Sequence, residues 1–181
     1  MPKIPLPRGK GGLAAIVGAV AAAILFNAVP IHEGEVLTTY NDPVGIATVC
    51  YGDTDPDMAV PGATYTREEC LLSLERQLIA HAGPVVECAP GVTASPEMTA
   101  AFVSLAYNIG TNGFCKSTVA KRYRAGNYTG ACAAIEMWTK AKGRTLPGLV
   151  RRRADERRLC ERGIPAMQAA RFIPAEGADD D

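Results

Sequence analysis

An excess of one charge is missing from this sequence, because 19 lysines and arginines balance 19 aspartates and glutamates. A dedicated nucleic-acid-binding protein usually carries a strong basic excess, so the balance argues against that class. No two cysteines have the close C-x2-C spacing of a zinc site, and we expect no metal and no organic cofactor. No internal repeat is evident. The 181 residues, 48% of them apolar, suit one globular domain with tails.

The six cysteines are spread widely along the chain. Their even number and wide spacing suit a disulfide framework formed in an oxidising compartment. The alternative is a cytosolic protein with six buried free thiols. We predict the pairing that joins near neighbours in the sequence, namely Cys50–Cys70, Cys88–Cys115 and Cys132–Cys160.

Residues 11–29 form an apolar segment that contains no charged side chain. Lys3, Arg8 and Lys10 precede it and Pro30 follows it. As a helix rising about 1.5 Å per residue, it would be ~28 Å long, close to the thickness of a bilayer core. Basic residues before such a segment stay in the cytoplasm. The rest of the chain would then face outward, in agreement with the cysteine content.

The segment is only weakly hydrophobic, because seven of its residues are alanine and three are glycine. Both residues contribute little transfer free energy, so insertion into a membrane should be marginal. Three interpretations remain: a cleaved signal peptide, a stable anchor, or a reversible signal that inserts and later leaves the membrane. We prefer the third. If Glu33 is catalytic, cleavage near residue 28 would remove the helix that should hold it, and a permanent anchor would keep it at the interface.

The rest of the chain changes from short β-type runs to helices. Residues 31–65 hold runs of β-forming residues, such as 48–52, separated by turn residues. From about residue 66 onward the pattern is helical, and Gly163 ends the last helix. A small β-rich lobe therefore precedes a larger helical lobe, an α+β arrangement. Capping residues or prolines mark the helix starts: Thr66 with Glu69, Ser95 with Pro96, Ser117, Asn127 and Pro147.

Two carboxylates, Glu33 and Asp42, stand in contrasting positions. We expect Glu33 at the end of a helix and Asp42 in a turn. Cleavage of a glycosidic bond needs one carboxyl group that protonates the leaving oxygen and a second that stays ionised. A helix end against a core favours a protonated carboxyl group, whereas a polar turn favours an ionised one. Alone this signal is weak, because surface charge explains such a pair equally well.

The residues around this pair resemble the active-site signature of phage-type lysozymes. In that family a glutamate is followed nine residues later by an aspartate, and six residues after that by a threonine. Glu33, Asp42 and Thr48 occupy these positions here. The resemblance extends over about residues 31–162. Four further positions match in type and spacing: Gly34, Tyr40, Gly45 and Gly52.

The resemblance implies a lysozyme-like fold and hydrolysis of the β-1,4 bond between N-acetylmuramic acid and N-acetylglucosamine in peptidoglycan. Glu33 would be the general acid, Asp42 would orient water or stabilise developing charge, and Thr48 would hold that water. The reaction could be inverting or retaining, because that depends on the separation of the carboxyl groups in space. Many members have histidine just after the glycine matched by Gly52, whereas this chain has Asp53.

The apolar segment resembles the signal-arrest-release segment of a subset of phage endolysins. The implied divisions are a basic leader (1–10), a membrane segment (11–30), a catalytic domain (31–163) and a flexible tail (164–181). The implied partners are peptidoglycan, the host inner membrane and the host secretion machinery, with the periplasm as final location. We expect a monomer that is inactive while tethered. No cysteine precedes Cys50, so activation would follow refolding of the segment rather than disulfide exchange.

Other candidates carry weaker signals. Tyr107 and Asn108 could line a sugar cleft, since phenol and amide groups bind sugar hydroxyl and N-acetyl groups, but a structural role is equally open. Glu35 is an alternative acid that misses the family spacing, His32 could tune Glu33, and Trp138 is expected in the core. The basic cluster near the C-terminus is expected to form an exposed helix face with many ion pairs. It contains Arg151, Arg152, Arg153, Arg157 and Arg158, interleaved with Asp155, Glu156 and Glu161.

Two other classes of function remain open. A membrane-tethered module that binds the cell wall without catalysis would not need Glu33. A small protein that disrupts bilayers through residues 11–29 would leave the cysteine-containing domain without a role.

Overall fold

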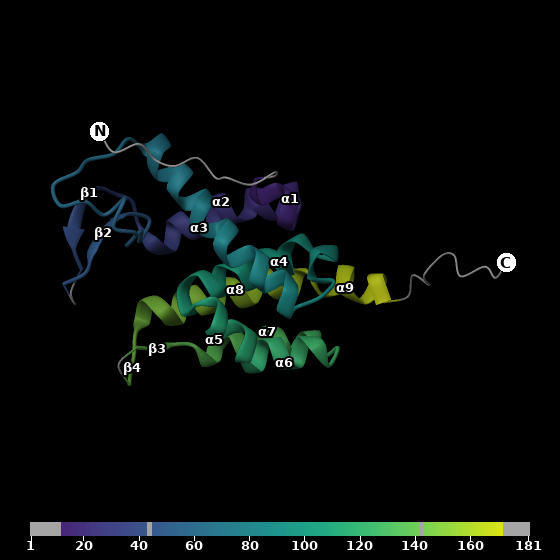
Figure 1. Ribbon diagram of the computed structural model, residues 1–181. Helices are drawn as coiled ribbons and strands as arrows, with labels where there is room; N and C mark the ends of the chain where they lie inside the picture. The colour runs from purple at the N-terminus through teal and green to yellow at the C-terminus, as the bar shows by residue number, and fades with distance from the viewer. Residues whose placement is uncertain (1–11, 43–44, 142, 172–181) are drawn as a thin grey trace.

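The computed structural model describes residues 12–42, 45–141 and 143–171. The expected leader at 1–10 and the last ten residues lie outside these ranges. Helices make up most of the described chain, and two small antiparallel sheets lie at one end of the molecule (Figure 1). One sheet is near the N-terminal helices and the other precedes the long C-terminal helix. The predicted α+β arrangement is confirmed.

The N-terminal apolar segment forms two helices instead of one continuous helix. α1 (Leu13–Val17) and α2 (Ala19–Glu33) are separated by Gly18, whose φ of 82° lies in the region that favours glycine. α2 continues through Pro30 and ends at Glu33. Among the described residues, no helix combines the length and the apolar content that a membrane span requires. The expected single apolar helix preceding the domain is therefore replaced by two short ones.

One face of these two helices belongs to the hydrophobic core. α1 packs against α3 (Arg67–Cys88), and α2 packs against α4 (Pro96–Ile109). The opposite face of α2 exposes Val20 and Ile31. Ala22 is buried, and five further buried side chains recur every four residues, the spacing of one helix face: Leu13, Val17, Ala21, Leu25 and Val29.

The small lobe is built on a β-hairpin. β1 (Val36–Asn41) pairs antiparallel with β2 (Ala47–Cys50). The register places Tyr40 opposite Thr48. The predicted β-type run at 48–52 therefore begins within β2 and continues into the turn after it.

The helical lobe begins at the predicted capping box. The Thr66 hydroxyl accepts a hydrogen bond from Glu69 N, and the Glu69 carboxylate accepts one from Thr66 N at 2.7 Å. α4 starts after Ser95 with Pro96 in its first turn, as expected, and is the most deeply buried helix of the described chain. The remaining elements are η1 (Val92–Ala94), α5 (Thr111–Lys116), α6 (Thr118–Arg124), α7 (Tyr128–Ala134), η2 (Ile135–Met137), β3 (Lys140–Ala141), β4 (Arg144–Thr145), α8 (Pro147–Arg162) and α9 (Ile164–Arg171).

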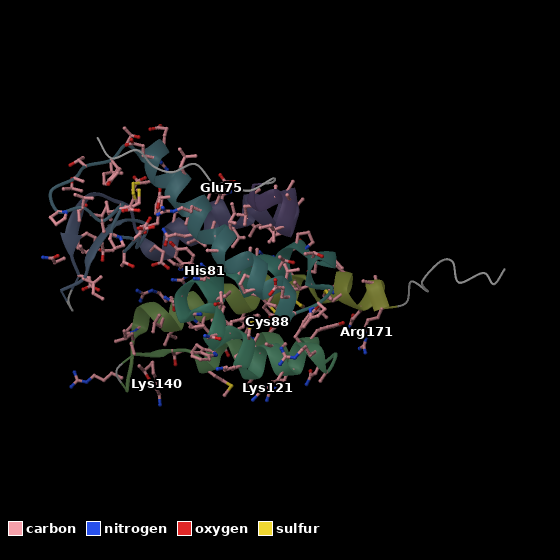
Figure 2. All side chains as sticks on the ribbon, in the orientation of Figure 1. Glu75, His81, Cys88, Lys121, Lys140 and Arg171 are labelled. Carbon is pink, nitrogen blue, oxygen red and sulfur yellow. A yellow bond between two sulfur atoms is a disulfide. The ribbon has the colours of Figure 1, made fainter. Side chains whose placement is uncertain are left out.

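The start of the expected flexible tail is a helix in the structure. α9 buries Met167 and places the Arg171 guanidinium 5.8 Å from the centre of the Tyr128 ring. Figure 2 shows Arg171 at the end of the molecule far from β1 and β2. The structure thus describes residues 164–171 as a helix, where the sequence predicts a flexible tail. A single buried methionine gives too weak a sequence pattern to reveal this packing.

The three disulfides have the predicted pairing. Cα–Cα distances are 5.0 Å for Cys50–Cys70, 5.6 Å for Cys88–Cys115 and 5.5 Å for Cys132–Cys160. They join β2 to α3, α3 to α5, and α7 to α8. Each closes a loop spanning 20 to 28 residues, which should stabilise the fold by about 3 kcal/mol through chain entropy. The Cys50–Cys70 bond holds the small lobe on the helical lobe.

Candidate active site

Glu33 is the last residue of α2, as expected for the helix end, and it meets a buried arginine. Its Oε1 lies 2.5 Å from Nη1 of Arg152 on α8, a residue 119 positions later in the chain. The Glu33 side chain is 19% exposed and that of Arg152 only 4%. The carboxyl group is therefore open to solvent on one side and held by a guanidinium on the other.

The other carboxyl oxygen of Glu33 lies beside the small lobe. A Cβ added to Gly52, just after β2, would lie 3.5 Å from Glu33 Oε2. Gly52 also has a φ of 84°, which a residue with a side chain rarely adopts. The glycine thus permits the turn and keeps space beside the carboxyl group. Glu33 consequently lies where α2, the end of the hairpin and α8 meet.

Asp42 and Thr48 are both hydrogen-bonded to the backbone of Ile46, which lies between them on the hairpin. The N–H of Ile46 donates to Asp42 Oδ1 at 2.8 Å. The carbonyl of Ile46 accepts both from Asp42 N at 2.9 Å and from the Thr48 hydroxyl at 3.0 Å. Thr48 is buried, and Asp42 is half-buried. Two of the three predicted catalytic residues are thus fixed to each other through Ile46.

Asp53, the departure from the family pattern, has a structural role. Its carboxylate is buried and accepts hydrogen bonds from Ser73 Oγ, from Arg76 Nη2 at 3.0 Å and from Asp55 N at 2.9 Å. Arg76 also pairs with Asp55 at 3.1 Å. Because Ser73 and Arg76 lie on α3, Asp53 fastens the turn after β2 to the helical lobe.

Tyr107 and Asn108, the predicted cleft residues, both bond within the protein. The Tyr107 hydroxyl lies 2.8 Å from the Tyr51 carbonyl and 3.0 Å from Gln77 Oε1. Burial raises the pKa of Tyr107, and the nearby carboxylates of Glu33 and Asp53 raise it further. Asn108 Oδ1 accepts from Arg153 Nη2 at 2.5 Å. These contacts give both residues a structural function, and a sugar contact stays a prediction.

The basic cluster on α8 is only partly the exposed face that the sequence predicts. Arg157 and Arg158 do pair with exposed carboxylates. Arg152 and Arg153 instead are buried, so the prediction is wrong for them. Residues 147–162 contain few large apolar side chains, so their composition favours an exposed helix. A buried arginine is tolerated only with carboxylate partners. For Arg152 one such partner is Glu156, four residues later on α8.

The remaining candidates have local partners. His32 Nε2 lies 3.9 Å from Asp155 Oδ2, and burial and Arg152 lower the His32 pKa below 6.5. Glu35 accepts from the Tyr51 hydroxyl at 2.7 Å and lies 3.5 Å from Arg67 Nε. Trp138 packs against the core, as expected. Within the described ranges, no group of three or more histidine, cysteine or acidic residues could hold a metal ion.

Comparison with known proteins identifies the family of the chain. Residues 30–156 match the family described as phage lysozyme. The chain belongs to the phage lysozyme family. It is therefore related to lysozyme-type glycoside hydrolases, and its lysozyme-like fold is confirmed by solved structures. The family match begins within α2 and includes both the hairpin and most of α8.

Individual relatives cover most of the chain. A SAR-endolysin of Bacteriophage PS119 is 39% identical over 130 residues, which is 71% of this chain and 75% of that protein. The structure of an endolysin from Escherichia coli O157:H7 phage FAHEc1 has a TM-score of 0.69 and 28% identity, covering 80% of this chain and 92% of that one. The active form of the P1 phage endolysin Lyz shares the fold, with a TM-score of 0.70 at 21% identity over 86% of this chain and 98% of that one.

The Asp53 network gives a prediction about stability. Asp53→Asn leaves Arg76 with a weaker buried partner, so the free energy of unfolding should fall by about 1–3 kcal/mol. Chemical denaturation measures this change. Asp57→Asn, the same substitution at an exposed position in the same loop, is the matched control and should change it by less than ~0.5 kcal/mol. Equal stability of the two variants would contradict the assigned role.

Proposed function

We propose that the protein is an endolysin that hydrolyses the β-1,4 bond between N-acetylmuramic acid and N-acetylglucosamine in bacterial peptidoglycan and so lyses the host cell. The observation that carries this proposal is the Glu33 carboxyl group, held by Arg152 on one side and bordered by Gly52 on the other. The second carboxylate, Asp42, is supplied by the hairpin. The SAR-endolysin relatives, at 39% and 37% identity, support the same activity.

Glu33 acts as the general acid in this mechanism. A general acid must present a proton to the glycosidic oxygen from a fixed direction. Arg152 binds Oε1 and thereby fixes the orientation of the carboxyl group. Oε2, next to Gly52, is then the oxygen that carries the proton. The absence of a side chain at Gly52 leaves room for a sugar ring to approach this oxygen.

Asp42 and Thr48 act on the attacking water and on the sugar carbon, whereas Glu33 acts on the leaving oxygen. The Thr48 hydroxyl donates its proton to the Ile46 carbonyl, so its oxygen retains lone pairs that accept a hydrogen bond from water. Asp42, oriented by the Ile46 N–H, either activates that water or stabilises positive charge at the sugar. Direct attack by water and attack after a covalent intermediate both fit this arrangement.

Replacing the acid tests the mechanism. Glu33→Gln is nearly isosteric but has no proton to donate, so the rate of clearing a peptidoglycan suspension should fall by about 10²–10⁴-fold. Glu35→Gln is the matched control, because this carboxylate two residues later bonds Tyr51 and should be dispensable for chemistry. Circular dichroism verifies that both variants fold.

Full clearing by Glu33→Gln would refute the acid assignment. If folded wild-type protein clears nothing but sediments with peptidoglycan, the wall-binding module becomes the better account.

We further propose that the protein is inactive while residues 11–29 lie in the host inner membrane, and active once released into the periplasm. The side chains that would face lipid include those buried in the core here, such as Leu25 and Val29. These side chains cannot lie in the membrane and in the protein core at the same time. Glu33 follows Val29 by four residues on the same helix, so its position depends on where that helix lies. The host secretion machinery would place the chain, and the oxidising periplasm suits its three disulfides.

The location of the segment should therefore control activity. Muramidase activity per molecule, measured in isolated membranes and in the released fraction of the same culture, should be at least ~10-fold higher after release, because only the released form can place Glu33 against Arg152. Glu33→Gln protein, prepared in both forms, gives the background. Equal activity in the two fractions would contradict control by the membrane segment.

A further inference from the structure

A network of buried charges lies behind Glu33, on the side away from Gly52. The Arg152 guanidinium branches within it: Nη1 bonds Glu33 Oε1 at 2.5 Å, and Nε bonds Glu156 Oε1 at 3.0 Å. Its Nη2 bonds the Ser104 carbonyl of α4 at 3.2 Å. The position of the group that touches Glu33 is therefore set from α8 and α4 together.

Glu156 is the centre of this network. Its Oε1 also accepts a hydrogen bond from Ser104 Oγ at 2.7 Å, and its Oε2 lies 2.8 Å from Arg153 Nη1. Glu156 and Arg153 are both fully buried, at 2% and 0% exposure, so water screens their charges weakly. One carboxylate thus contacts two arginines and a hydroxyl without touching the solvent side of the site.

We propose that Glu156 is a positioning residue for the reaction, which holds Arg152 against Glu33 and offsets the positive charge that Glu33 experiences. This inference rests on the proposed role of Glu33 as general acid. A cation beside a carboxyl group favours its ionised form, and an ionised carboxylate has no proton to donate. Without Glu156, the positive charges of Arg152 and Arg153 would lie near Glu33, and the buried carboxylate that pairs with both arginines would be missing. With it, the guanidinium that orients Glu33 is paired with a buried carboxylate as well.

The other groups around Glu33 do not replace Glu156. On α2, burial and Arg152 lower the pKa of His32, and Asp155 of α8 faces this residue. On α4, burial raises the pKa of Tyr107, so its hydroxyl keeps its proton. In the small lobe, Asp53 is paired with an arginine of α3, and Asp42 is hydrogen-bonded to the hairpin backbone.

The pH dependence of kcat on soluble peptidoglycan fragments distinguishes this role from a purely structural one. The acid must be protonated, so activity declines as pH rises. Glu156→Gln removes a negative charge and favours ionised Glu33, so this alkaline limb should move to lower pH by about 0.5–1 unit, with kcat reduced ~10-fold. Arg152→Gln removes a positive charge and should move the limb to higher pH. Opposite shifts from two substitutions in one network are not expected of general destabilisation.

Two further variants complete the test. Glu161→Gln makes the same change at an exposed carboxylate on the same helix and should leave both kcat and the limb unchanged. Glu156→Asp keeps the charge but withdraws it by about 1.5 Å, so kcat should fall while the limb stays in place. Glu156→Asp also keeps the proposal testable if Glu156→Gln does not fold, as judged by the loss of a cooperative thermal transition.

Three results would overturn the proposal: a wild-type limb in folded Glu156→Gln, a wild-type kcat in Glu156→Asp, or shifts of the same sign in Glu156→Gln and Arg152→Gln. If instead Glu33→Gln remains fully active, the acid assignment fails, whatever Glu156 does. If Glu33→Gln is inactive and Glu156→Gln keeps the wild-type profile, only the positioning role is lost.

Discussion

The ion pair between Glu33 and Arg152 is the contact on which the rest of the site depends. It joins the end of the second helix to the last long helix across 119 residues of chain, at 2.5 Å. Burying a guanidinium is costly unless several acceptors surround it. Here Glu33, Glu156 and the Ser104 carbonyl provide them. The carboxyl group of Glu33, which we propose as the acid, is therefore part of what makes the buried arginine tolerable, and the site forms together with the core.

Under the proposed mechanism, this dependence would give the N-terminal segment two incompatible environments, the membrane and the folded core. Its alanines and glycines make it a poor membrane span. In the folded protein its larger side chains, Leu13, Val17, Leu25 and Val29, fill the core together with Ala21 and Ala22. The other described alanines of the segment are exposed or only partly buried. In the proposed mechanism, release from lipid and assembly of the site would follow from one rearrangement.

Features set by neighbours in the sequence were predictable. The Thr66–Glu69 capping box and the Ser95–Pro96 start involve residues within one turn, and the disulfides join cysteines close in the chain. Glu33 at a helix end followed from its pattern and family signature. The break at Gly18 was not predicted, because a single glycine within an alanine-rich run has no distinct local signal.

Contacts between distant residues were missed for a different reason. The composition of a run of arginines predicts an exposed face. Arg152 and Arg153 are buried nevertheless, because they form ion pairs with Glu33 and Glu156 inside the protein. Likewise, Asp53 acquires its role from Ser73 and Arg76 on another element. Only the three-dimensional packing shows which charges are paired inside.

The central claim is that packing of the second helix into the core presents Glu33 to Arg152. Amide hydrogen exchange on fully active, soluble wild-type protein tests it without altering a residue. The account predicts that amides from Leu25 to Glu33 exchange as slowly as those of α4, because both helices then open only with the whole domain. If that segment exchanges like an unstructured peptide while the protein clears peptidoglycan at its full rate, the account is contradicted.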